Sequence, residues 1–228
     1  MKAVLLAAGL GTRLRPITFF IPKPLGLVGG RPIVDYALAW LKRNKIDEIY
    51  VVGYYMQDLL RSYLSEHHPD VVFVRSRALL GTAGQLYYVR DHVAEGEDVL
   101  VAPGDVITDM PLEGLLRAHE EGGAKLTIAA REVEAGLRFG VLEVESGKLV
   151  KWREKPRFKH LVSTGIYVVD GGEVLKLKEE YLDFNEFAER LIPHVAVYKA
   201  EADVYDVGTL DDLYTTSSAL GNRQGLRA

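Results

Sequence analysis

The sequence predicts an α/β fold in which helices flank a mixed, mostly parallel sheet. Along residues 2–130, short apolar runs alternate with segments whose apolar residues recur every three or four positions. Such alternation is typical of strand–helix–strand units, whose right-handed crossovers build parallel sheets. Hydrophobic residues make up 48% and charged residues 26% of the 228 residues, a balance typical of a globular chain with a sizeable core.

The first expected element is a strand at Lys2–Ala8, an apolar run that ends at a glycine. Gly9–Pro24 holds two glycines and three prolines, so we expect a loop there. A helix is expected to begin at Pro32, because proline suits the first helical position and helical spacing follows over Ile33–Leu41. The other elements expected in this half are a strand at Glu48–Val52, a helix at Met56–Leu64, a strand at Val71–Val74, a helix at Thr82–Val93, a strand at Asp98–Val101, a helix at Leu112–Glu121 and a strand at Lys125–Ala130.

The second half of the sequence changes character. Val141–Val144 and Leu149–Trp152 flank a Ser-Gly turn, which predicts a β-hairpin. The elements expected after it are a strand at Leu161–Val169, a helix at Asn185–Leu191, a strand at Val195–Lys199 and a helix from Leu210. We find no linker and no internal repeat, so we expect one domain over residues 1–220 and a frayed tail over 221–228.

Composition argues against several classes of function. The formal net charge of −4 argues against nucleic-acid binding, and no apolar run reaches membrane-spanning length. The absence of cysteine excludes a disulfide framework and a thiolate metal site, and the histidines lack metal-ligand spacing. Because Met1–Ala8 is too short for a signal peptide, we expect a cytoplasmic protein that uses neither a membrane nor a nucleic acid as partner.

The strongest chemical signal is a basic loop near the N-terminus. Residues 1–34 contain no acidic residue but five basic ones, namely Lys2, Arg13, Arg15, Lys23 and Arg31. Gly9 and Gly11 let backbone N–H groups approach an anion closely. Arg13 can clamp phosphate oxygens with its planar fork, and Lys23 adds a point charge on a backbone restricted by the prolines at 22 and 24. We therefore expect a site for a small, highly charged anion.

Two named phosphate-binding motifs do not account for this loop. The dinucleotide fingerprint needs a third glycine where Leu14 stands, and the Gly-Lys-Ser/Thr of a P-loop is absent. The remaining alternative is an ordinary surface loop with solvated charges.

A series of strings, in order along the chain, resembles the signature of the sugar-phosphate nucleotidyltransferases. The matching strings are Gly9-Leu10-Gly11-Thr12-Arg13-Leu14-Arg15-Pro16, Pro22-Lys23-Pro24, Leu80-Gly81-Thr82-Ala83-Gly84, Ala102-Pro103-Gly104-Asp105, Phe139-Gly140-Val141, Glu154-Lys155-Pro156, Ser163-Thr164-Gly165-Ile166-Tyr167 and Asp206-Val207-Gly208-Thr209. The ordered series is more specific than any one string. The resemblance implies a Rossmann-like core with an integrated sugar-binding lobe.

The resemblance also implies a role for each matching residue. It implies that Arg13, Lys23 and Asp105 are catalytic, that Leu6, Ala8, Gly9, Gly11, Thr12, Ser76, Gly81 and Thr82 bind the nucleotide, that Gly140, Glu154, Lys155 and Thr164 bind the sugar phosphate, and that Asp105 and Asp206 hold Mg²⁺. The implied substrates are a nucleoside triphosphate and a sugar 1-phosphate. In-line attack on the α-phosphorus would release pyrophosphate, and bringing two polyanions together requires charge neutralisation.

The two aspartates have plainer explanations when taken alone. Asp105 fits a turn, and Asp206 fits a helix N-cap, although Thr209 suits that position better. The metal role predicts instead that both carboxylates converge at one sheet edge, because the carboxyl ends of parallel strands meet there.

The base and the sugar stay open at this point. Pyrimidine-using members of the family commonly carry Gln where Ser76 stands, so we expect a modest preference for GTP, as in mannose-1-phosphate guanylyltransferases. The alternatives are a glucose-1-phosphate uridylyl- or thymidylyltransferase and an inositol-1-phosphate cytidylyltransferase. The sequence stops soon after the second aspartate, so we expect a catalytic unit without the β-helix of many relatives. A homo-oligomer is left open.

Two further classes of protein compete with this hypothesis. A non-catalytic regulatory subunit would keep the fold but tends to lose the arginine, the lysine or a carboxylate. A metal-dependent glycosyltransferase would use a sugar that is already activated. Because Arg13, Lys23, Asp105 and Asp206 are all present, the sequence favours the enzyme.

Overall fold

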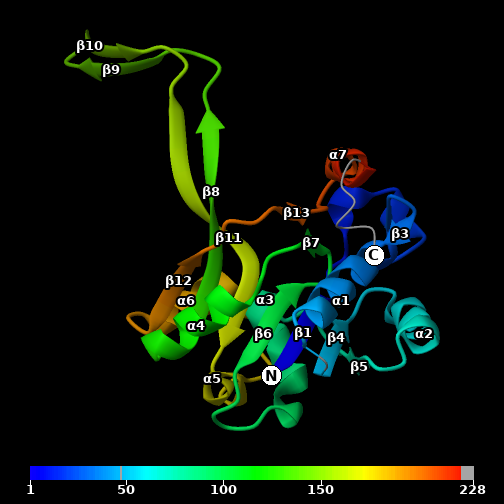
Figure 1. The fold of residues 1–228 in the computed structure, drawn as a ribbon. Helices are drawn as coiled ribbons and strands as arrows, with labels where there is room; N and C mark the ends of the chain where they lie inside the picture. The colour runs from blue at the N-terminus through cyan, green and yellow to red at the C-terminus, as the bar shows by residue number, and fades with distance from the viewer. Residues whose placement is uncertain (47, 222–228) are drawn as a thin grey trace.

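The fold of the chain was obtained as a computed structural model, which describes residues 1–46 and 48–221 (Figure 1). Its centre is a seven-stranded sheet with the strand order β12-β8-β11-β6-β1-β4-β5. These strands are β1 (Lys2–Ala7), β4 (Glu48–Gly53), β5 (Val72–Arg75), β6 (Val99–Pro103), β8 (Leu126–Gly136), β11 (Arg157–Val169) and β12 (Val195–Lys199). Only β11 runs antiparallel to its neighbours, β6 and β8. The mixed, mostly parallel sheet predicted from the sequence is confirmed.

Both faces of the sheet are buried, as the alternation of side chains along β1 illustrates. Ala3 and Leu5 belong to one buried cluster, whereas Val4 belongs to another. Successive strand side chains point to opposite faces, so both faces must be covered. The first cluster includes residues of α1 (Ile33–Arg43), α2 (Gln57–His67) and α4 (Glu113–Gly122), and the second includes residues of α5 (Gly171–Leu175) and α6 (Phe184–Leu191). A further helix, α7, spans Leu210–Gly221.

The single helix expected over Thr82–Val93 is wrong. The chain forms one α-helical turn, α3 (Gly81–Gly84), and continues as the 3-10 helix η4 (Gln85–His92). The physical reason is a competing tertiary contact: the N–H groups of Ala83 and Gly84 both donate to the carbonyl of Leu182. That contact anchors the start of the segment to a distant loop.

Several short elements were not expected from the sequence. The loop after β1 contains the 3-10 turns η1 (Thr12–Leu14), η2 (Ile17–Phe19) and η3 (Lys23–Leu25). Two short strand pairs also occur: β2 (Leu27–Val28) with β3 (Arg31–Pro32), and β7 (Val106–Thr108) with β13 (Val204–Asp206). The second pair matters for the site, because it brings two distant segments into register.

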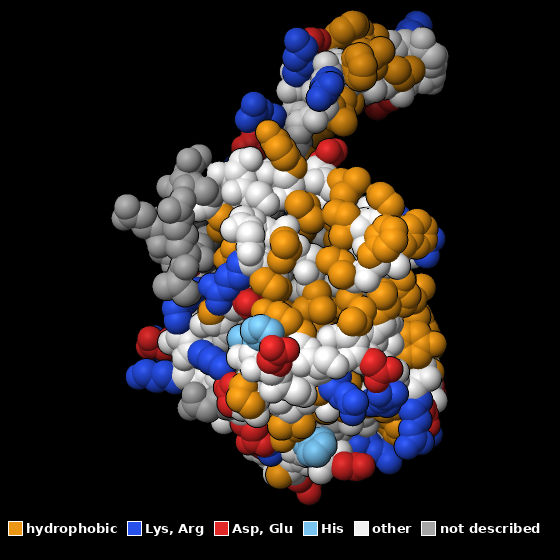
Figure 2. All heavy atoms as spheres, turned by 90° about the vertical axis from the view of Figure 1, so that its right-hand side faces the viewer, with side chains coloured by type: hydrophobic (Ala, Val, Ile, Leu, Met, Phe, Trp, Pro, Cys, Tyr) orange, Lys and Arg blue, Asp and Glu red, His pale blue; other side chains and the backbone are white. Residues whose placement is uncertain are grey.

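The predicted hairpin is confirmed, and it lies at the tip of a long projection. β9 (Val141–Glu145) pairs with β10 (Lys148–Arg153), and β8 and β11 extend beyond the body of the sheet to carry the pair outward (Figure 1). We call residues 137–156 the arm. Figure 2 shows the projection standing away from the body, with hydrophobic and charged side chains mixed over its surface. Its large apolar residues are exposed, with Trp152 at 59%.

The C-terminal tail lies largely beyond the part of the chain that the structure describes. The frayed tail expected at 221–228 lies, apart from Gly221, outside the described residues. None of the helices in the described ranges has the length and apolarity needed to cross a membrane.

Candidate active site

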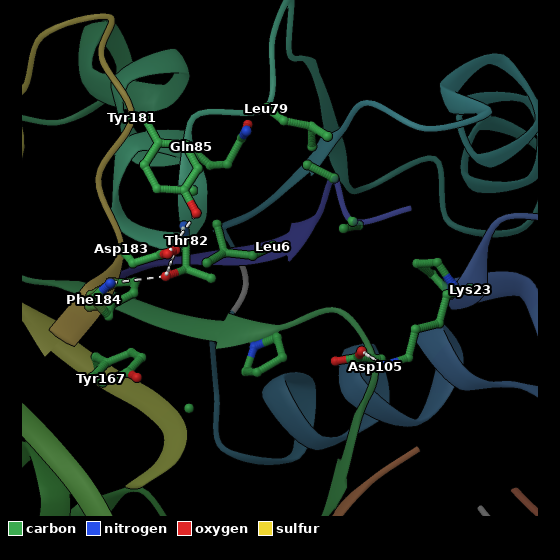
Figure 3. Close-up of a pocket in the computed structure, with 17 residues that line it drawn as sticks. Leu6, Lys23, Leu79, Thr82, Gln85, Asp105, Tyr167, Tyr181, Asp183 and Phe184 are labelled. Carbon is green, nitrogen blue, oxygen red and sulfur yellow. Dashed lines mark hydrogen bonds and ion pairs between the residues drawn. The ribbon is translucent and has the colours of Figure 1, made fainter. Parts of the chain in front are cut away.

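A cleft opens at the carboxyl ends of β1 and β6, the edge at which the sequence predicts the site. Its volume is about 420 Å³, within the range of small-molecule sites. The lining residues are Leu6, Ala7, Ala8, Gly9, Lys23, Pro24, Leu79, Gly81, Thr82, Gln85, Pro103, Asp105, Gly165, Tyr167, Tyr181, Asp183 and Phe184. Figure 3 shows Lys23 and Asp105 at one end, and Leu79, Gln85 and Tyr181 at the opposite end.

At the charged end, one lysine faces both predicted metal carboxylates. Lys23 Nζ forms an ion pair with Asp105 and lies 3.5 Å from Asp206 Oδ1. Asp206 is brought there by the β7–β13 pairing, in which it stands opposite Val106, the neighbour of Asp105. Asp105 and Asp206 therefore meet at one lysine, although Asp206 arrives on the antiparallel β13 and not on a strand of the central sheet; their role as metal ligands stays a prediction. The N-cap alternative for Asp206 is excluded, because Thr209 Oγ1 accepts the hydrogen bond from the Asp212 N–H at the start of α7.

A second chamber of about 550 Å³ adjoins the first and shares Lys23 and Asp105 with it. Arg13 lines this chamber, and its guanidinium nitrogens come within 3.0 Å of the position that a Cβ at Gly208 would occupy. Asp206, Thr164 and Arg131 complete the polar part of its wall. The paired chambers thus meet at the lysine and the two carboxylates.

At the opposite end, the Gly-Thr-Ala-Gly turn is held by a loop about a hundred residues away in sequence. Asp183 Oδ1 accepts hydrogen bonds from the N–H of Thr82 (2.8 Å) and from its hydroxyl (3.0 Å). Gly81 adopts φ +74°, and a Cβ there would lie 2.6 Å from the Leu182 carbonyl, so only glycine fits.

The Asp183 carboxylate is stabilised in its charged form. The hydroxyl of Tyr181 donates to Asp183 Oδ2 (2.7 Å), and this bond, with those from Thr82, holds the pKa of Asp183 below its ordinary value despite partial burial. The same bond raises the pKa of the Tyr181 hydroxyl. The turn is thereby fixed by a charged acceptor, which makes stronger hydrogen bonds than a neutral one.

The structure brings most of the predicted site residues together. Leu6, Ala8, Gly9, Gly81 and Thr82 line the first chamber with Lys23 and Asp105, and Arg13, Thr164 and Asp206 line the second. Gly11, at φ +62°, and Thr12 belong to the same loop but line neither chamber.

Four further predicted residues, which lie outside this loop, do not line the chambers either. Ser76 is fully buried, and its hydroxyl donates to the carbonyl of Ala78, so it supports the cleft wall from behind. Gly140, Glu154 and Lys155 lie on the arm, and a carboxylate oxygen of Glu154 accepts a hydrogen bond from Trp152 Nε1 (3.0 Å). Gly140 lies beside the same indole and carboxylate, so Glu154 and Gly140 are in contact with residues of the arm itself.

Four polar lining residues were missed by the sequence analysis: Gln85, Arg131, Tyr181 and Asp183. Gln85 follows the Gly-Thr-Ala-Gly string directly, so its proximity to a predicted binding turn was a usable signal. Tyr181 and Asp183 carried none, because they reach the site only through the tertiary contact with Thr82.

The fold and the cleft are those of an α/β protein whose ligand site lies at the carboxyl edge of its sheet. The chain belongs to the nucleotidyl transferase family, whose model matches residues 2–223. This finding confirms the resemblance drawn from the ordered strings.

Named relatives agree with the family. A probable mannose-1-phosphate guanyltransferase of Schizosaccharomyces pombe is 33% identical over 197 residues, covering 79% of this chain and 48% of the relative. A putative mannose-1-phosphate guanyltransferase of Sulfolobus acidocaldarius is 34% identical over 172 residues, covering 74% of this chain and 48% of the relative. The chain therefore spans about half the length of these curated relatives.

Solved structures share the fold. HddC from Yersinia pseudotuberculosis complexed with GMP-PN matches with a TM-score of 0.78 at 20% identity, covering 96% of this chain and 99% of that one. A putative glucose-1-phosphate thymidylyltransferase from Bacillus anthracis matches with a TM-score of 0.73 at 24% identity, covering 98% of this chain and 96% of that one.

Proposed function

We propose that the chain transfers a nucleotidyl group from a nucleoside triphosphate to a sugar 1-phosphate and releases pyrophosphate. The observation that carries the proposal is the meeting of Lys23, Asp105 and Asp206 where the two chambers join. A transfer between two substrates needs their reacting phosphates to meet at one charged site. The adjoining chambers could hold one substrate each, with Lys23 and Asp105 lining both. Family membership supports the same reaction class.

The chemistry assigns each side chain a task. A phosphate oxygen of the sugar phosphate would form a bond to the α-phosphorus, while the bond from that phosphorus to the pyrophosphate oxygen breaks. Lys23 and Arg13 would neutralise phosphate charge as it shifts, and the rigid loop backbone would orient the triphosphate. Catalysis of this kind depends mainly on position and charge, because the phosphate of the second substrate is itself the nucleophile.

Mg²⁺ is the proposed cofactor, and the donor set fits it. Asp105 and Asp206 supply hard carboxylate oxygens, and Mg²⁺ is commonly bound through one or two carboxylates together with substrate phosphates. Within residues 1–46 and 48–221, no cluster of three or more His, Cys, Asp or Glu side chains that could hold a metal ion occurs. When bound, the ion would neutralise phosphate charge.

For the nucleotide, we propose a modest preference for GTP. Relatives named as mannose-1-phosphate guanyltransferases support this choice, as does the Gly-Thr-Ala-Gly turn. Mannose 1-phosphate is accordingly the first sugar phosphate to test. Thr164 lines the second chamber, whereas a sugar-binding role for Gly140, Glu154 and Lys155 stays a prediction about the arm. A cytoplasmic location and a homo-oligomeric state likewise stay predictions.

The decisive test is a matrix of nucleoside triphosphates against sugar 1-phosphates, scored by pyrophosphate release with Mg²⁺ and with EDTA. We expect release only with both substrates and the ion, and the highest rate with GTP. A regulatory subunit would bind nucleotide-sugar without releasing pyrophosphate. A clear preference for UTP or dTTP would overturn the choice of base but not the reaction class.

A further inference from the structure

Gln85 occupies an unusual position in the cleft. It is the first residue of η4 and is 2% exposed, yet it lines the first chamber. Figure 3 places its carboxamide beside Leu79, at the end opposite Lys23 and Asp105. A ligand whose phosphates lie near Lys23 would extend its far end toward this carboxamide.

The hydrogen bonds around Gln85 fix the orientation of its amide. Nε2 donates to the carbonyl of Ala78 (3.0 Å), which also accepts from the hydroxyl of Ser76 (2.7 Å). A backbone carbonyl has two lone pairs, and both are thus used. Turning the amide over would point its oxygen at the Ala78 carbonyl oxygen, an unfavourable contact between two acceptors. The Nε2 group of Gln85 is therefore fixed by its hydrogen bond to the Ala78 carbonyl.

That orientation leaves the amide oxygen without a donor. Gln85 Oε1 is buried and has no hydrogen-bond partner among the described residues. Leaving a buried acceptor unpaired is costly, and such groups in folded proteins call for a specific explanation. Among the lining residues, Leu6 and Leu79 offer no donor, and the hydroxyls of Tyr181 and Thr82 donate to Asp183 instead.

We infer that Gln85 is a base-specificity residue, whose amide oxygen accepts a hydrogen bond from a ring or amino N–H of the bound nucleobase. The inference rests on the proposed function and deepens it. The inference also explains the position of Ser76, because the Ser76 hydroxyl donates to the same Ala78 carbonyl that orients Gln85. Ser76 then acts as a positioning residue behind the base site.

Guanine suits this acceptor better than uracil or thymine does. Its N1–H and 2-amino group present two adjacent donors on one edge. The single N3–H of uracil or thymine is flanked by two carbonyl oxygens, which would lie against Gln85 Oε1 and repel it. The unpaired oxygen of Gln85 therefore favours the edge with neighbouring donors over the edge of uracil or thymine, in agreement with the GTP preference proposed above.

The first test compares nucleotide affinities of the wild type, Gln85→Met and Gln57→Met by calorimetry. Methionine keeps the length of the side chain but removes the acceptor. Gln57, the first residue of α2, is a matched control, because its Oε1 is also buried and unpaired but lines neither chamber. We expect Gln85→Met to weaken GTP binding by roughly 10- to 100-fold and to lower the GTP-to-UTP affinity ratio, while Gln57→Met changes neither.

A second measurement avoids dependence on a variant that folds poorly. The chain has only three glutamines, so ¹⁵N-glutamine labelling gives side-chain amide signals that Gln57→Met helps to assign. Adding GTP to the wild type should shift the Gln85 side-chain amide signals and leave those of Gln57 in place. Unshifted Gln85 signals at saturating GTP, or an unchanged GTP-to-UTP ratio in a folded Gln85→Met, would overturn the inference while leaving the proposed reaction intact. If the wild type binds no triphosphate, the proposed function fails as well.

Discussion

The cleft and the arm are held together by contacts of different range. In the cleft, Thr82 is hydrogen-bonded to Asp183, which lies 101 positions later in the sequence. Lys23, near the N-terminus, forms an ion pair with Asp206, near the C-terminus. In the arm, contacts are local: Arg153 pairs with Glu143, and Trp152 bonds Glu154 two residues away.

This difference affects what each region can be expected to do. Side chains of the cleft are fixed relative to one another by the whole fold, so their geometry is as stable as the fold itself. Side chains of the arm are fixed only relative to their hairpin neighbours, and a region with few buried contacts opens at low free-energy cost. Precise catalytic geometry is therefore expected in the cleft, and the arm is the region whose role is open to experiment.

The largest expected effect is at the charged end of the cleft. Lys23→Ala should lower turnover about a hundredfold or more, because a preorganised charge facing the phosphates is lost. Lys151→Ala, on the arm, should leave turnover near that of the wild type. Pyrophosphate release under saturating substrates measures both, with circular dichroism to check folding. Normal turnover in a folded Lys23→Ala protein would remove the cleft from the mechanism.

A smaller but distinct effect is expected at the turn that Asp183 holds. Asp183→Ala leaves the Thr82 N–H and hydroxyl without their acceptor, which should lower the free energy of unfolding by about 1–3 kcal/mol. The KM for the triphosphate should also rise, since the turn lines the cleft. Asp91→Ala is the control, because this aspartate is highly exposed and its loss should change stability by less than about 0.5 kcal/mol. Urea unfolding and steady-state kinetics separate the two effects.

The pH dependence of stability offers a third comparison. The hydrogen bonds from Tyr181 and Thr82 hold the pKa of Asp183 below its ordinary value, so the folded state binds fewer protons than the unfolded chain. Stability from this group is present above the unfolded pKa, near 3.9, and is lost as pH falls through the lower folded pKa. Asp183→Asn should therefore flatten the fall in unfolding free energy below about pH 4.

A matched carboxylate lies on β8, between the body and the arm. Hydrogen bonds from Lys199 and Lys159 lower the pKa of Glu132 to about 2, but this group is solvent-exposed. Its contribution should vanish at about 1 M salt, where exposed charges are screened, whereas that of Asp183 should largely persist. If salt reduced the stability contributions of Glu132 and Asp183 equally, the contacts of the cleft would not be better shielded from solvent than those of β8.

The smallest expected effects are on the arm. Trp152→Ala should change the free energy of unfolding by less than about 0.5 kcal/mol, because the ring is exposed and lies beside Gly140 of the arm. Glu154→Gln sharpens the comparison: if the arm contacts the sugar phosphate, the KM for that substrate alone should rise. Unchanged KM values for both substrates would confine the active site to the two chambers.

The sequence predicted the features that depend on local chemistry. Periodicity located the seven strands of the central sheet, and the hairpin followed from its Ser-Gly turn, because both depend on backbone preferences within a few residues. The glycine loop was found for the same reason, whereas the two carboxylates were singled out by the family resemblance. Their convergence was expected from a common edge of parallel strands, but the structure produces it through the antiparallel β7–β13 pair. Thr209 was likewise recognisable as the better helix cap from its position before Leu210.

Tertiary structure alone decided which side chains enter the cleft. Whether the hydroxyl of Ser76 faces a base or the Ala78 carbonyl depends on partners that no local pattern specifies. The broken helix after Gly81 and the entry of Asp183 both follow from one contact between segments about a hundred residues apart. Hydrogen-bond partners are chosen by packing between distant elements, and a buried polar group such as Gln85 is recognised only when its neighbours are in place.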